Sequence, residues 1–383
     1  MLIDDQVVLS GIGITDAAAV ALLHGLVAQP SLSGNEQAAV AYLVAEMRRM
    51  GMRAWIDSTG NAVGSVGEGG PEIVLLGHID TVAGEIPVRL VDGKMYGRGA
   101  VDAKGPLAAF VVAAARLGVA GFGGRITVVG CVEEESPSSR GAHGILGDFR
   151  PDFCVVGEPS GVDTITLGYK GSLRARLRIA QPCGHSAHNR PTVAEIGSNV
   201  WQRIRAWSDD LNDGRERAWD QLLPALVGIK SGSDGIQEWC ELDLSIRLPK
   251  DCPPDAVAIH LQELVPAGSV TILGSVPAFR ATRTSPLCRS LIVAMRDQQL
   301  HPRFVVKTGT ADMNVVGPVW NCPIVTYGPG DSALDHTPDE HILVDEYLQS
   351  IRILEHALQL LIPGAVTEPK IVLTTKASKR NDL

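Results

Sequence analysis

The chain has 383 residues, of which 45% are hydrophobic and 20% are charged, a composition typical of a soluble globular protein. This length exceeds what one ordinary hydrophobic core accommodates, so two domains are expected. The formal net charge of -9 argues against nonspecific nucleic-acid binding, which requires clustered Lys and Arg side chains.

The seven cysteines include no Cys-x-x-Cys pair, which argues against a thiolate zinc site and favours free thiols in a reducing compartment. No membrane-spanning run or signal peptide is visible, because the first 20 residues carry three aspartates and lack a basic start. We therefore expect a cytoplasmic protein that uses neither nucleic acid nor membrane as a partner.

Residues 16–51 are expected to be helical. Asp16 is a candidate cap for a first helix, and Ser33 with Glu36 has the spacing of a capping box for a second, which Gly51 would end. Short apolar strands then alternate with a helix, with strands expected at 73–76, 126–132 and 153–156 and the helix at 105–118. This alternation predicts an α/β sheet.

The pattern changes near residue 172, where residues 173–179 alternate apolar and basic side chains, as a half-exposed strand does. Further elements are expected as strands at 238–248 and 270–273 and helices at 192–211, 253–265, 285–300 and 343–362, with a strand at 322–327 and a loose tail from 365. We expect a catalytic domain formed by 1–171 and 284–383, interrupted by an α+β lid and dimerisation domain at 172–283.

Acidic and histidine side chains follow several of the predicted apolar strands. They are His78, Asp80, Asp102, Glu134, Glu135, Glu158, Asp335 and His336. Functional sites in open α/β sheets gather at the carboxyl ends of the strands, so these side chains should meet. Each alone is more typical of a capping or solvated residue. Together their charges would repel unless divalent metals lay among them, and zinc, cobalt or manganese accepts such ligands.

The ordered motifs of the chain resemble those of the M20 metallopeptidases, the group of acetylornithine deacetylase, succinyl-diaminopimelate desuccinylase and carboxypeptidase G2. The matching segments are GHID (77–80), GRGAVDAKG (97–105), EEESPSSRG (133–141), GEPS (157–160), GHSAH (184–188) and DHTPDE (335–340). The resemblance covers most of the chain and implies an amide hydrolase with two divalent metals, most simply zinc. It also implies a homodimer formed through a ferredoxin-like lid.

The resemblance implies a role for each ligand. His78 and Glu158 would bind one metal, Glu135 and His336 would bind the other, and Asp102 would bridge the two.

Two further carboxylates have implied roles beside the metals. Asp80 would accept the spare imidazole N–H of His78 and fix its tautomer. Glu134 would be the general base that takes a proton from the attacking water. Because the family commonly shows Asp-Glu-Glu at this point, a shift of one residue would make Glu133 the base.

The remaining candidates concern the substrate. In related dimers a lid histidine reaches the partner's active site and stabilises the oxyanion. The Gly-x-x-Ala-His frame favours His188, with His185 second. Arg247 stands where relatives hold a substrate carboxylate, for which a forked donor is suited. Gly309 and Thr310 are weaker substrate-contact candidates.

The EEESPSSRG, GYKGS (168–172) and KTGTADMN (307–314) segments are most similar to hydrolases that release lysine or ornithine from an amino-group carrier protein, in lysine and arginine biosynthesis. A basic patch would help to bind an acidic carrier, and its candidates are Arg174, Arg176, Arg178 and Arg190. One alternative is a deacetylase acting on N-acetylornithine, N-acetyl-lysine or another small N-acyl amino acid. A second is a catalytically silent binding homologue, against which the complete set of motif residues argues.

Overall fold

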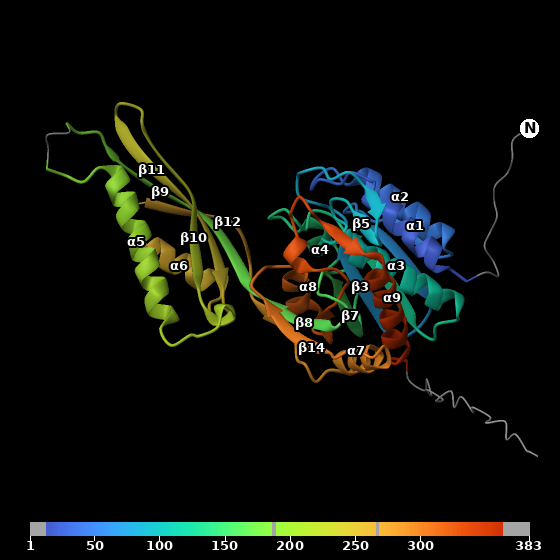
Figure 1. Cartoon of the computed structure of the whole chain (residues 1–383). Coiled ribbons are helices and arrows are strands. Elements are labelled where there is room, and N and C mark those ends of the chain that lie inside the picture. The colour runs from blue at the N-terminus through green and yellow to red at the C-terminus, as the bar shows by residue number, and fades with distance from the viewer. Residues whose placement is uncertain (1–12, 186–188, 266–267, 363–383) are drawn as a thin grey trace, which may run out of the picture.

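The computed structural model describes residues 13–185, 189–265 and 268–362, which form a larger body and a smaller lobe that stands off from it (Figure 1). The main sheet of the body contains β1 (Arg53–Ile56), β2 (Ala62–Gly67), β3 (Glu72–His78), β6 (Arg125–Cys131), β7 (Phe153–Gly157), β8 (Thr164–Tyr169), β13 (Phe279–Arg280), β14 (Arg303–Lys307) and β15 (Ile324–Thr326). A small sheet adds β4 (Arg89–Val91), β5 (Lys94–Tyr96) and β16 (His341–Leu343). The helices of the body are α1 (Asp16–Val27), α2 (Gln37–Arg49), α3 (Lys104–Val119), α4 (Arg140–Gly144), α7 (Pro286–Asp297), α8 (Met313–Trp320) and α9 (Val344–Gln359).

The centre of the main sheet is parallel, with the strand order β6-β3-β7-β15. Ile73 and Leu75 of β3 pack into one apolar cluster with α1, α2, α3, α7 and α9, whereas Val74 and Leu76 pack into another with α4 and α8. Because β3 is buried on both faces, its sequence is a continuous run of apolar residues rather than an alternation of apolar and polar ones. The predicted α/β fold is thereby confirmed.

The smaller lobe is an antiparallel sheet with the order β10-β11-β9-β12, and helices α5 and α6 pack against its strands. Its elements are β9 (Gly171–Pro182), α5 (Val193–Asn212), β10 (Leu223–Ser233), β11 (Gln237–Leu248), α6 (Pro254–Leu264) and β12 (Gly268–Val276). Leu173 and Leu177 of β9 join the core beneath the helices, while the arginines between them lie on the opposite face. The sheet of the lobe ends at Val276, and β13 pairs with β8 in the main sheet.

Both predicted helix caps near the N-terminus differ from the structure, although α1 begins at Asp16 as expected. Thr15, not Asp16, caps α1 through a hydrogen bond from the amide of Ala18. The predicted capping box of α2 is wrong, because Glu36 is the N-cap and makes no side-chain cap. Instead the Ser33 hydroxyl donates to Asp80 Oδ2 at 2.6 Å, in the region of the candidate site.

All seven cysteines are free, as expected. Within the described ranges, none of the helices combines the length and apolar character needed to cross a membrane.

Candidate metal centre and active-site cavity

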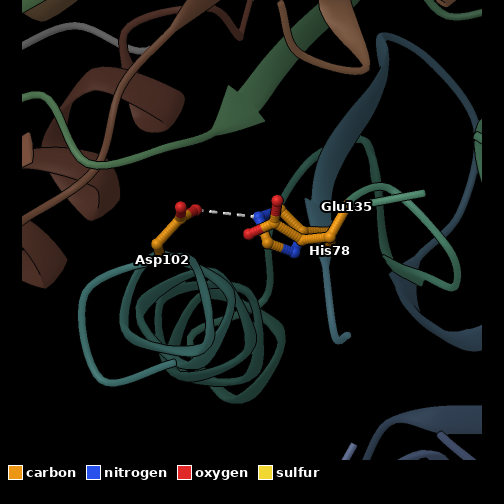
Figure 2. Close-up of side chains that lie close together, drawn as sticks. All are labelled: His78, Asp102 and Glu135. Carbon is orange, nitrogen blue, oxygen red and sulfur yellow. Dashed lines mark hydrogen bonds and ion pairs between the residues drawn. The ribbon is translucent and has the colours of Figure 1, made fainter. Parts of the chain in front are cut away.

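The predicted ligands come from several segments that meet at one edge of the main sheet. His78 is the last residue of β3 and Glu158 directly follows β7, so the parallel strands bring the two together. Asp102 precedes α3, and Glu135 lies in the loop after β6. Figure 2 shows the side chains of His78, Asp102 and Glu135 converging on one point.

The Asp102 carboxylate lies between two imidazoles. Its Oδ1 is 3.0 Å from Nε2 of His78, and its Oδ2 is 3.1 Å from Nε2 of His336. Glu158 Oε1 is 4.0 Å from Nε2 of His78, and Glu135 Oε1 is 2.8 Å from Nε2 of His336. The five side chains therefore form two groups that share Asp102, one group on each of its oxygens.

These residues fit a pair of divalent cations. Ligand atoms of His78, Asp102 and Glu135 all lie within 4.8 Å of one another. Burial raises the pKa of Glu158 well above its usual range, and the charge of Asp102 adds to the effect. The hydrogen bond to Asp102 raises the pKa of His336 to about 9. So many carboxylates in one partly buried site need cations, and imidazole nitrogen with carboxylate oxygen is a donor set that zinc and similar ions accept.

Asp80 is buried beside His78 and contacts more than the imidazole. Nδ1 of His78 is 3.1 Å from the backbone carbonyl of Asp80, whereas Asp80 Oδ1 is 3.6 Å away. The carboxylate instead accepts the backbone amides of Glu134, at Oδ1, and Glu135, at Oδ2, each at 3.0 Å. Asp80 therefore orients the imidazole through its carbonyl and holds the loop after β6 through its side chain.

Of the three consecutive glutamates, the first bonds to nearby polar side chains, whereas the other two line the cavity. Glu133 has a positive φ of 58°, which is uncommon for a residue with a side chain. Its carboxylate accepts from Arg140 Nε at 2.6 Å and from the Ser138 hydroxyl at 2.7 Å. Glu134 and Glu135 line the cavity, and burial raises the pKa of Glu134 well above its usual range. This geometry favours Glu134 over Glu133 as the base.

Sequence reasoning missed Glu340, although it is the last residue of the DHTPDE segment. This fully buried carboxylate accepts the backbone amides of Val101 at 3.0 Å and Asp102 at 3.2 Å. It also accepts from Arg98 Nη1 at 2.7 Å. Glu340 thus fixes the loop that carries Asp102.

Gly99 lies in the same loop, with a φ of +84°. A Cβ there would lie 2.7 Å from Cγ2 of Thr81, so the conformation and the space both require glycine.

The metal centre opens into a cavity of about 740 Å³ that both the body and the lobe line. Arg247 of β11 and the Gly309–Thr310 turn contribute to the wall, and Arg247 Nη1 donates to Thr310 Oγ1 at 3.3 Å. The structure thus brings the three predicted substrate contacts to one place. His185 is exposed and does not line this cavity, and His188 lies outside the described residues.

The four arginines proposed as a basic patch are not equivalent. Arg176 pairs with Asp243 at 2.7 Å, and Arg178 pairs with Glu241. Arg190 lies 3.4 Å from Glu238. Only the fourth, Arg174, lines the cavity. Three of the four candidate arginines therefore have an acidic partner, so the four do not form a patch of unbalanced positive charge.

Comparison with known proteins agrees with this architecture. Residues 74–360 match the model of "Peptidase family M20/M25/M40". The chain is 40% identical to the [LysW]-lysine hydrolase of Deinococcus radiodurans, over 91% of this chain and 98% of that one. It is 39% identical to a putative [LysW]-lysine/[LysW]-ornithine hydrolase of Thermococcus kodakarensis, over 89% of this chain and 92% of that one.

Solved structures share the fold at low sequence identity. An M20 metallo-carboxypeptidase of Sulfolobus solfataricus superposes with a TM-score of 0.74 at 18% identity, over 89% of this chain and 98% of that one. A dinuclear metal-binding M20 peptidase of Bacillus subtilis gives a TM-score of 0.68 at 14% identity, over 90% of this chain and 97% of that one.

The match to the M20/M25/M40 family model and to a [LysW]-lysine hydrolase, together with the histidine-carboxylate centre, identifies a metal-dependent hydrolase. The chain belongs to peptidase family M20/M25/M40, and the family prediction made from the motifs is confirmed.

Proposed function

We propose that this protein hydrolyses the amide bond between lysine, or ornithine, and the C-terminal glutamate of an amino-group carrier protein. The observation that carries this proposal is the 40% identity to the [LysW]-lysine hydrolase of Deinococcus radiodurans, because it extends over 98% of that enzyme. The motif residues of the catalytic centre are all present, which argues against a silent binding homologue. The reaction would belong to lysine and arginine biosynthesis in the cytoplasm.

The proposed cofactor is a pair of divalent cations, most simply zinc, with cobalt or manganese as alternatives. One would be held by His78 and Glu158 and the other by Glu135 and His336, with Asp102 shared between them. When bound, such a pair polarises the amide carbonyl and makes a nucleophile of water at neutral pH.

The chain's own residues would transfer the protons. Glu134 lines the cavity next to the ligands and would accept the proton of the attacking water at its carboxylate. The same carboxyl would then deliver that proton to the leaving amine. Asp80 would keep both partners in place, because it contacts His78 and accepts the amide of Glu134.

The amine side of the substrate carries a cationic ammonium group in its side chain, and Asp335 is suited to bind it. This carboxylate lines the cavity, and its Oδ1 is buried with no hydrogen-bond partner among the described residues. A buried carboxylate oxygen without a donor is costly, and a lysine or ornithine ammonium would satisfy it.

We further propose that residues 172–283 act as lid and dimerisation domain on a catalytic domain of 1–171 and 284–383. The lobe has an apolar core of its own and contributes Arg247 to the cavity wall, which supports this division. Closure would exclude water from the amide. In a dimer formed through the lobe, His188 of one protomer would reach the oxyanion of the other.

The experiment that tests the function compares two substrates on purified enzyme reconstituted with zinc, cobalt or manganese. One is the carrier protein charged with lysine, followed by intact mass. The other is N-acetylornithine, followed by release of the free amine. We expect a strong preference for the charged carrier. A strong preference for the acetylated compound would instead assign the protein to the small-molecule deacylases.

A further inference from the structure

One face of the lobe sheet carries a row of alternating arginines on β9, and the members of the row differ in their partners. Arg176 lies opposite Asp243 on β11, and Arg178 lies opposite Glu241. Both arginines are ion-paired with these residues. Charged side chains on an exposed sheet face are commonly balanced across strands in this way.

Arg174, the member nearest the body, breaks the pattern. Its cross-strand neighbours are Ser245 on β11 and Gly274 on β12, neither of which can balance its charge. No hydrogen bond or ion pair joins its guanidinium to any described residue, although it lines the cavity.

A second arginine stands close to it on the same wall. Arg247 lies opposite Ser172 on β9, so it is a diagonal neighbour of Arg174 on the same face of the sheet. Thr310 is its one side-chain partner in the described part of the chain. Burial lowers the pKa of Arg247, and the charge of Arg174 lowers it further. Two guanidinium groups with no acidic partner among the described residues therefore line the same cavity as the proposed metal ligands.

Like charges held together without a counterion favour an anionic ligand, and guanidinium groups bind carboxylates through paired N–H donors. We propose that Arg174 and Arg247 bind two separate carboxylates of one substrate, Arg247 that of the amino acid and Arg174 that of the acyl group. Arg174 is thus the residue that selects an acyl group with its own free carboxylate.

This inference rests on the proposed function and specifies its chemistry. A C-terminal glutamate has two carboxyl groups, and only one is used in the amide, so the other remains anionic in the same residue, three carbons from the carbonyl of the bond that is cleaved. An N-acetylated amino acid offers only the carboxylate of the amino acid. Arg174 would therefore discriminate glutamyl-linked substrates from acetylated ones without any contact with the rest of a carrier protein.

The test uses two small substrates on the metal-loaded enzyme. In the first, lysine is joined through its α-amine to the side-chain carboxyl of N-acetylglutamate, whose α-carboxylate is free. In the second, that α-carboxylate is replaced by a neutral carboxamide. We expect the wild-type enzyme to prefer the carboxylate substrate by roughly 10- to 100-fold in kcat/KM, the range of a charged hydrogen bond.

The substitution Arg174→Gln should remove this preference by lowering kcat/KM for the carboxylate substrate alone. Arg174→Lys should restore part of it, because a lysine keeps the charge but not the forked geometry. The matched control is Arg178→Gln, on the same strand and face but ion-paired with Glu241, which should leave both rates unchanged.

The inference is overturned if the wild-type enzyme hydrolyses both substrates equally, or if Arg174→Gln slows both to the same extent or neither. Failure of the proposed function gives a different result. The wild-type enzyme would then leave both compounds and the charged carrier intact while hydrolysing N-acetylornithine.

Discussion

The backbone amide of Glu134 donates a 3.0 Å hydrogen bond to Oδ1 of Asp80, which ties the proposed general base to the strand end that carries a proposed metal ligand. The position of the base and the orientation of the imidazole of His78 consequently depend on one buried residue. A change at Asp80 should therefore affect proton transfer and metal affinity together.

Asp80→Asn should test this coupling. The new amide group cannot accept both backbone N–H groups of Glu134 and Glu135, so the loop should shift. We expect kcat to fall about 100-fold and metal affinity to fall about 10- to 100-fold. Steady-state kinetics at saturating metal and a metal titration measure the two effects. Loss of metal affinity with an unchanged kcat at saturation would show that Asp80 acts on the imidazole alone.

Glu134→Ala should lower kcat by about 10²- to 10⁴-fold, because it removes the group proposed to transfer the proton. The metal content, measured by mass spectrometry, should stay close to that of the wild type. Glu133→Ala is the matched control, since Glu133 bonds to Arg140 and Ser138 away from the ligands. Activity lost with Glu133→Ala and kept with Glu134→Ala would assign the base to Glu133.

Sequence patterns were sufficient for the features that depend on short stretches of chain. Strand β3 is buried on both faces, so its apolar run and the histidine at its end are visible without a structure. Contacts that cross the fold are not visible in this way. Ser33 and Glu36 have the spacing of a helix cap, but Ser33 bonds to Asp80, 47 positions away. The pairing of Arg176 with Asp243 likewise depends on the register of β9 and β11, which no local pattern reveals.

Removal of the metals should destabilise the protein, because the carboxylates of the centre would lose the cations that balance their charge and the imidazoles would lose their bonds to the metal. At metal concentrations near 100 times the dissociation constant, binding contributes about 2.7 kcal/mol per site to the free energy of unfolding. Thermal unfolding after chelation should therefore occur at a lower temperature and recover when zinc is restored. A melting temperature that is the same with and without metal would contradict a stoichiometric site.

Glu340→Gln should weaken the site from a distance. The Glu340 carboxylate accepts hydrogen bonds from Arg98 and from the backbone amides of Val101 and Asp102. In a glutamine, the side-chain NH₂ group would replace one carboxylate oxygen and would face one of these N–H donors. We expect a loss of about 1–3 kcal/mol in the free energy of unfolding and a 10- to 100-fold loss of metal affinity. Asp339→Asn, at the exposed neighbouring position, is the control and should change neither quantity. Equal effects of the two substitutions would show that Glu340 has no specific role in fixing the loop that carries Asp102.

Asp335→Asn should reveal how the enzyme recognises the cationic side chain of its product. Oδ1 of Asp335 is buried without a described partner at the cavity wall, so a substrate ammonium would be its counterion. We expect kcat/KM for carrier-linked lysine to fall about 10- to 100-fold, the range of a charged hydrogen bond. The matched control is carrier-linked norleucine, which lacks the ammonium and should be hydrolysed equally by both enzymes. Because Asp335 adjoins His336, damage to the metal centre would slow both substrates alike, and that outcome would contradict a role in side-chain recognition.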